Sequence, residues 1–187
     1  ILLSLVGSEM CIRDSLGSIS TILSNEINAN KIISVSGTLI EGLTGFSEGQ
    51  RIYIKAVMSD RPGNITESSE SITQIFIDET PASITPISIL SSNNNTALAK
   101  VGDSVSVSFT TSESLIDTTA TISGQNAIIT SLGGNQFVAV YVMDEGDSEG
   151  VIEFEISFID AQGNPLIDNN STTDASQVVF DKTKPTL

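Results

Sequence analysis

Two sets of oxygen-bearing side chains recur along the chain at almost the same spacing. In each set an Asp opens a turn, an Asn follows four positions later directly after a Gly, and a second Asp ends the next apolar segment. The first Asp residues of the two sets are 100 positions apart (160 − 60), and the last are 103 apart (181 − 78). Carboxylate and amide oxygens are the ligands that calcium takes in proteins. The candidate calcium ligands are Asp60, Asn64 and Asp78 at one junction between domains, and Asp160, Asn164 and Asp181 at the next.

Turn chemistry explains the same residues without a metal. An Asp side chain accepts hydrogen bonds from the backbone that follows it, Gly adopts positive φ, and Asn tolerates it. The alternating acids of an EF-hand loop do not occur in the sequence. A separate acidic cluster, Asp144, Glu145, Asp147 and Glu149, also has two interpretations, a solvated hairpin tip or a cation cage. The residue types alone leave both questions open.

Composition excludes several classes of function. The formal net charge is −15, from 23 acidic and 8 basic residues, so nucleic acid and anionic membrane surfaces would be repelled. The chain contains no His, which excludes Ser-His-Asp and Cys-His catalysis and His-ligated zinc. No pair of carboxylates is placed in a recognisable catalytic pattern. We therefore expect a protein that is not an enzyme and does not insert into a membrane through this segment.

The hydrophobic pattern predicts an all-β fold. Apolar residues alternate with polar ones, as in Val105, Val107 and Phe109 against the intervening serines, and no segment has helical periodicity. Seven strands in about 100 residues are typical of an immunoglobulin-like β-sandwich. The expected strands are 33–35, 51–58 and 71–77 in a first, incomplete unit, and 84–90, 103–110, 120–122, 127–130, 137–143, 151–158 and 177–180 in a second unit.

The first fifteen residues differ from the rest of the chain. They hold the only Cys, Cys11, and lack strand alternation. They have neither the basic start nor the cleavage site of a signal peptide. The stretch from Ser4 to Ser15 closely resembles the translation of a sequencing adapter, which would make it foreign to the protein. The expected organisation is thus a non-native segment at 1–15, a first unit at 16–80, a second at 81–181, and the start of a further repeat at 182–187.

Short segments of both units carry a resemblance to a known family. They are AKVGD at 99–103, TISGQ at 121–125, DAQGN at 160–164 and FDKTKP at 180–185 in the second unit, with VSGT at 35–38, SD at 59–60, GN at 63–64 and DETP at 78–81 in the first. Through these segments the run from Ser92 to Pro185 is similar to the bacterial immunoglobulin-like repeats of large surface and secreted proteins of environmental bacteria, and residues 32–81 resemble a shorter relative. The resemblance implies tandem immunoglobulin-like β-sandwiches.

These observations together predict a role for the chain. We expect a segment of an extracellular or cell-surface protein that acts as a stalk or spacer in an adhesin-like array, with neighbouring repeats of the same chain as its partners. One alternative is an accessory carbohydrate- or protein-binding module of a secreted enzyme, although only 5% of the residues are aromatic. Another alternative is a linker stiffened by calcium at the six candidate ligands.

Overall fold

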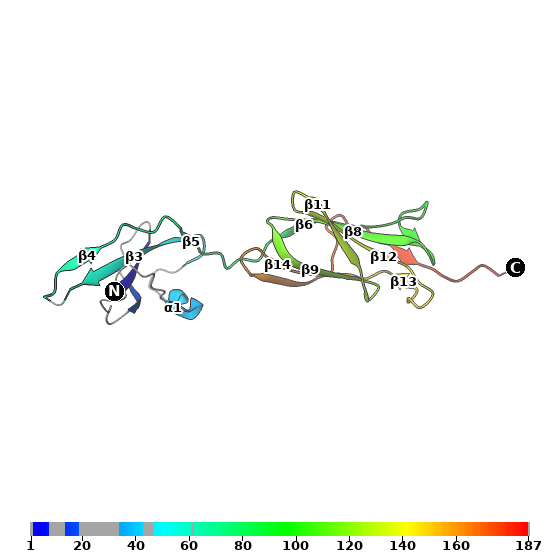
Figure 1. The fold of residues 1–187 in the computed structure, drawn as a ribbon. Helices are drawn as coiled ribbons and strands as arrows, with labels where there is room; N and C mark the ends of the chain where they lie inside the picture. Colours follow the sequence, from blue (N-terminus) through cyan, green and yellow to red (C-terminus); the bar gives the residue numbers. More distant parts are fainter. Residues whose placement is uncertain (1, 8–13, 19–33, 43–46, 61, 187) are drawn as a thin grey trace. The chain divides into compact units, whose positions relative to one another are not determined.

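The computed structural model describes residues 2–7, 14–18, 34–42, 47–60 and 62–186. The chain divides into two compact units, Ile1–Glu79 and Thr80–Leu187, and is all-β with several antiparallel sheets, as the sequence predicts (Figure 1). The helix α1 (Gly37–Glu41) is a single short turn. No helix in the described ranges is long and apolar enough to cross a membrane.

Unit 1 is organised around one strand. Its elements are β1 (Leu2–Gly7), β2 (Asp14–Ser18), α1, β3 (Arg51–Ser59), β4 (Ile65–Glu67) and β5 (Ile75–Phe76). The strands form a sheet in the order β2-β1-β3-β4, and β5 also pairs with β3. The strand predicted at 51–58 is confirmed, and its inward Ile52 is buried together with Ile77.

Residues 2–7, within the segment expected to be non-native, form β1, which pairs with β3 from Leu2↔Val57 to Gly7↔Ile52. The foreign origin of residues 1–15 stays a prediction. Two other expectations for unit 1 differ from the structure. The strand expected at 33–35 is absent from residues 34–36, because the chain turns into α1 there; Ile33 lies outside the described residues. Of the strand expected at 71–77, only Ile75 and Phe76 form the strand β5. At Ser71 the side-chain Oγ, in place of a backbone carbonyl oxygen, accepts from Ile54 N.

Unit 2 contains two four-stranded sheets and one small sheet. The sheets have the strand orders β11-β12-β8-β6, β10-β9-β14-β15 and β13-β16-β7. Their strands are β6 (Ile84–Ser91), β7 (Leu98–Ala99), β8 (Ser104–Thr111), β9 (Leu115–Ile122), β10 (Gln125–Asn126), β11 (Ile128–Gly133), β12 (Gln136–Val142), β13 (Gly150–Val151), β14 (Phe154–Asp160), β15 (Pro165–Asn169) and β16 (Val179–Phe180).

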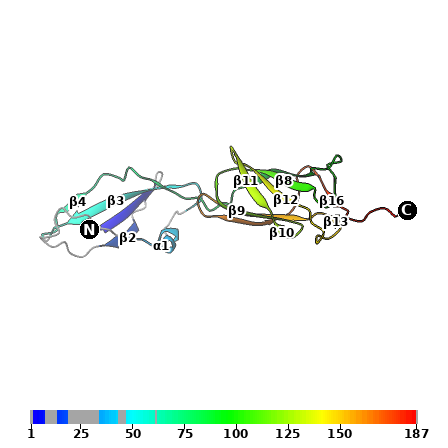
Figure 2. The ribbon, with the colours of Figure 1, turned by 45° about the vertical axis from the view of Figure 1, so that its right-hand side comes forward.

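The two larger sheets of unit 2 share one hydrophobic core. They lie as opposing layers in both views (Figures 1 and 2), an arrangement compatible with a β-sandwich. Each inner face follows the predicted alternation. Val107 on β8 and Ile156 on β14 are fully buried, and their neighbours within each strand face outward. The core cluster comprises Ala82, Ile87, Ile89, Ala99, Val105, Val107, Phe109, Ala120, Ile122, Ala139, Met143, Ile152, Phe154, Ile156, Phe158, Val178 and Phe180.

Most strands predicted for unit 2 are confirmed, with two kinds of difference. The segment predicted as one strand at 151–158 is divided, because Ile152 donates to the Val178 carbonyl oxygen and β13 pairs with β16 rather than β9. Strand β15 was not expected, because it begins with Pro165, which lacks an N–H and is rare inside sheets. As an edge strand beside β14 it tolerates this residue.

Serine and threonine hydroxyls replace backbone acceptors at several strand edges. At each place a strand residue donates its N–H to a side-chain Oγ, and the Ser or Thr donates its own N–H back to that residue's carbonyl oxygen. These bonds occupy edge N–H groups that would otherwise be open to pairing with another chain. The five pairs are Ile54–Ser71, Ala56–Ser68, Ser83–Ser112, Ile87–Thr173 and Ser104–Ser92, with distances between 2.8 and 3.0 Å.

A buried carboxylate organises the turn before β8. Asp103 accepts hydrogen bonds from Asn93 Nδ2 at 2.7 Å and from Lys100 N and Lys100 Nζ at 2.9 Å each. The Lys100 hydrogen bond, then that of Asn93, lower the pKa of Asp103 from an ordinary 3.8 to about 2, against the opposing effect of burial. Gly102 supplies the positive φ of 89° that this turn requires.

Asp103 is expected to make unit 2 sensitive to acid. Because its folded pKa is depressed, its stabilisation is present above the unfolded value and is lost as the pH falls from about 4 to about 2. Thermal unfolding across this range should show Tm falling less steeply in Asp103→Asn, which cannot ionise, than in the natural chain. Parallel Tm curves for the two proteins would contradict this assignment.

Candidate functional site

The turn after β14 uses its carboxylate internally. Asp160 is fully buried, and its Oδ1 accepts hydrogen bonds from the backbone N–H groups of Gln162 at 3.0 Å, Gly163 at 2.8 Å and Asn164 at 2.8 Å. Its Oδ2 accepts from Asn164 Nδ2 at 3.1 Å. Burial raises the pKa of Asp160, but the bonds from Asn164, Gln162 and Gly163 outweigh it and leave the pKa below its ordinary value.

The corresponding turn of unit 1 has the same geometry in a more exposed position. Asp60 follows β3 and accepts from Asn64 N and Asn64 Nδ2, both at 2.7 Å. The hydrogen bonds from Asn64 lower the pKa of Asp60. Gly63 has a φ of 97°, close to the 105° of Gly163. In both loops the Asp carboxylate accepts from the backbone and side chain of the Asn four positions later, which accounts for the repeated Asp, Gly and Asn. Asp160 also accepts from Gln162 N, as in an Asx turn, whereas Pro62 at the matching position of unit 1 has no N–H to donate.

The remaining two candidate ligands lie at the opposite ends of their units. Ile77, next to Asp78, donates to the Gln50 carbonyl oxygen at the start of β3, whereas Asp60 follows its end. Asp181 follows β16, which pairs with β13 before β14 begins, whereas Asp160 ends β14. Each unit thus has a whole strand between its Asp–Asn turn and its second Asp, so the sets expected at each junction are not brought together.

The described part of the chain contains no group of three or more His, Cys, Asp or Glu side chains arranged to hold a metal ion. Asp160 instead has its oxygens aimed at backbone N–H groups, which a cation would have to displace. Asp181 likewise accepts from Thr183 N at 2.9 Å.

The acidic loop between β12 and β13 holds the chain where it leaves unit 2. Lys182 Nζ donates to the carbonyl oxygens of Glu145 and Asp147, each at 2.8 Å. Glu149 Oε1 accepts from Lys182 N at 2.9 Å and Thr183 Oγ1 at 2.7 Å. The hydrogen bond from Thr183, followed by that from Lys182 N, lowers the pKa of Glu149.

This loop fits neither sequence interpretation. It is not a hairpin tip, because β12 and β13 belong to different sheets. The positively charged group that contacts the loop is the ammonium group of Lys182.

Asp147 is buried and accepts from Asp144 N at 2.7 Å and from Tyr141 Oη at 3.3 Å. Burial, with the nearby Asp147 carboxylate, raises the pKa of Tyr141. Sequence reasoning missed Lys182, because no local pattern links it to a loop more than thirty positions earlier.

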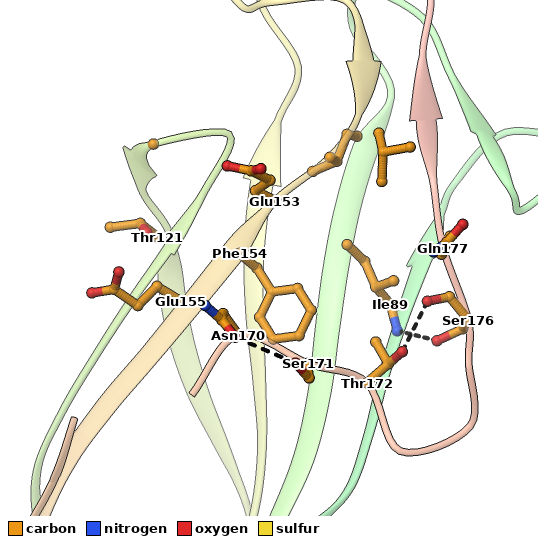
Figure 3. Close-up of a pocket in the computed structure, with 13 residues that line it drawn as sticks. Ile89, Thr121, Glu153, Phe154, Glu155, Asn170, Ser171, Thr172, Ser176 and Gln177 are labelled. Carbon is orange, nitrogen blue, oxygen red and sulfur yellow. Dashed lines mark hydrogen bonds between the residues drawn. The ribbon is translucent and has the colours of Figure 1, made fainter. Parts of the chain in front are cut away.

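A polar groove of about 560 Å³ runs beside β14. Figure 3 shows Phe154 and Ile89 at its centre, with Thr172, Ser176 and Gln177 on the side of Ile89, and with Glu155 and Asn170 on the side of Phe154. Within the described ranges, the side chains of Glu153, Glu155 and Gln177 make no hydrogen bond or ion pair. Such groups can bind hydroxyl or amine donors, but Phe154 is buried and offers no face for stacking a sugar.

No protein-family model matches this chain, and a search of the curated proteins found no match. What the chain does must therefore be inferred from the chemistry and geometry of its described residues.

We expect the Asp160 turn to stabilise unit 2 by hydrogen bonding and without calcium. Asp160→Ala leaves the backbone N–H groups of Gln162 and Asn164 without their acceptor, while Gly163 N keeps the Asp160 carbonyl oxygen, and it should lower Tm by several degrees. The loss should be the same in EDTA, in calcium and in magnesium, as measured by scanning calorimetry of the full chain. Asp60→Ala, in the exposed turn, is the matched control and should lower Tm less. A rise in the Tm of the natural chain with calcium alone, abolished by Asp160→Ala, would contradict this role.

Proposed function

We propose that the chain is a non-enzymatic structural segment of an extracellular or cell-surface bacterial protein. In this proposal, tandem immunoglobulin-like β-sandwich units are joined in series as a stalk or spacer of an adhesin-like array. The neighbouring repeats of the same chain are its partners. The main support is that the segment before β6 and the segment after β16 lie at opposite ends of the β-sandwich-like core of unit 2 (Figure 1).

Contacts at each end of unit 2 support this role. At the N-terminal end, Asn164 Nδ2 lies 3.5 Å from the Thr80 carbonyl oxygen, and Ser83 and Ser112 exchange two hydrogen bonds of 2.9 Å. At the C-terminal end, Lys182 and Thr183 are held by the loop that contains Glu149. A tensile load on the chain would therefore reach the core through hydrogen-bonded segments at both ends.

Strand directions in unit 2 also suit a load-bearing element. Strand β6, the first of the unit, is paired with β8 from Ile84↔Thr111 to Ser91↔Val105, and β16, the last, is paired in parallel with β7. A pull along β6 shears several of its ladder hydrogen bonds to β8 together instead of opening them one at a time. A binding module that used the polar groove beside β14 would not need hydrogen-bonded segments at both ends of the unit. The spacer role is therefore better supported than the role of a binding module.

Single-molecule stretching of the full chain tests the proposal. Unit 2 should unfold in one discrete step that adds roughly 300 Å of chain, the length expected for about 100 extended residues. Lys182→Ala removes the two hydrogen bonds that the Lys182 ammonium group donates to the carbonyl oxygens of Glu145 and Asp147. We expect it to lower the free energy of unfolding by about 1–2 kcal/mol and to lower the mean unfolding force.

The matched control is Lys184→Ala, since Lys184 makes no hydrogen bond or ion pair in the part of the chain that the structure describes. Its unfolding force should equal that of the natural chain. Extension of unit 2 without a discrete step would refute the load-bearing role, and equal losses in the two lysine variants would refute the contribution of the Glu149 loop.

A further inference from the structure

One sheet of unit 2 is free of charge in a strongly acidic chain. The chain carries 23 acidic and 8 basic residues, yet β6, β8, β11 and β12 contain no Asp, Glu, Lys or Arg. The inner face of this sheet belongs to the core. Its outer face is therefore a neutral surface four strands wide.

The outer face of this sheet is also apolar. Strand register aligns Ile128, Val140, Ser106 and Leu90 in one row across all four strands. Ile128 is 76% exposed and Leu90 48% exposed at the two ends of this row. Apart from Leu132, which is 63% exposed, the other outward residues of the row and its neighbours are Ser, Thr and Val, so few side chains stand out from the surface. We define the neutral face as Leu90, Ser106, Ser108, Ile128, Thr130, Leu132, Val138, Val140 and Val142.

The outer face of the opposite sheet differs in charge. It presents Asp117 on β9 and Glu155 on β14, with Glu153 immediately before β14, and all three side chains are exposed. Two copies of a chain with net charge −15 would repel each other through that face. On the neutral face this local repulsion is absent, while burial of Ile128, Leu132 and Val142 is favourable.

We propose that the neutral face is a self-association surface, which packs against the neutral face of a second copy. This side-by-side pairing goes beyond the spacer role and does not depend on it. Four strands spaced about 4.8 Å apart and roughly six residues long present a face of roughly 400 Å². Two such faces bury roughly 800 Å², the size of a weak interface. In an array, the same weak contact repeated along neighbouring chains would gain strength through multivalency.

Sedimentation equilibrium of the full chain tests the proposal, from about 10 µM to about 1 mM, the range in which an interface of this size dissociates. Salt of about 0.15 M reduces the repulsion between the acidic chains. We expect a reversible monomer–dimer equilibrium. Ile128→Glu places a charge at the exposed end of the central row and should raise the dissociation constant at least about tenfold.

Ile116→Glu is the matched control, because Ile116 is 66% exposed at the start of β9, outside the neutral face, and the substitution adds the same charge. It should leave the dissociation constant within about twofold. Circular dichroism of both variants checks that the fold is retained, as expected for exposed positions. A chain that stays monomeric throughout, or a dimer weakened equally by both substitutions or by neither, would overturn the proposal.

Discussion

Unit 2 is organised by the burial of one hydrophobic core between its two larger sheets. Val105, Val107 and Phe109 on β8 face Ile122 on β9 and Ile156 on β14, and all are almost completely buried. A shift of β14 by one residue would turn its glutamate inward, so the alternation fixes the register. The register in turn places the Asp160 turn at one end of the unit and the Lys182 contacts at the other.

The acidic composition is accommodated because the carboxylates lie where they can be hydrogen-bonded or hydrated. Asp103, Asp147 and Asp160 are buried, and each accepts at least one backbone N–H in a turn. These turns connect strands at the ends of the sheets, while the β6–β8–β12–β11 sheet is left without charge. A solvated exterior and hydrogen-bonded segments at both ends suit a spacer. The one neutral face suits weak lateral contact between chains.

The alternating strands could be predicted from sequence, and the features that needed long-range geometry could not. β8 and β14 follow from two-residue periodicity, because each has one face in the core, and β12 follows from a continuous run of apolar residues. β15 was missed because Pro165 signals a turn, and the hydroxyl-mediated pairs were missed because a serine in an edge position looks like any polar residue. The six calcium candidates were grouped by spacing along the chain. The structure separates Asp78 from Asp60 and Asp181 from Asp160, because strand direction places each pair at opposite ends.

In the proposed spacer, the two units fold independently, each around its own core. Hydrogen exchange of the full chain in increasing denaturant distinguishes two independent units from one cooperative domain. Amides of β8, β9, β12 and β14 should lose protection together, as one cooperative unit, at a denaturant concentration above that at which β3 loses protection. Loss of protection in β3, β8 and β14 at one common concentration would mean a single cooperative domain and would contradict the account.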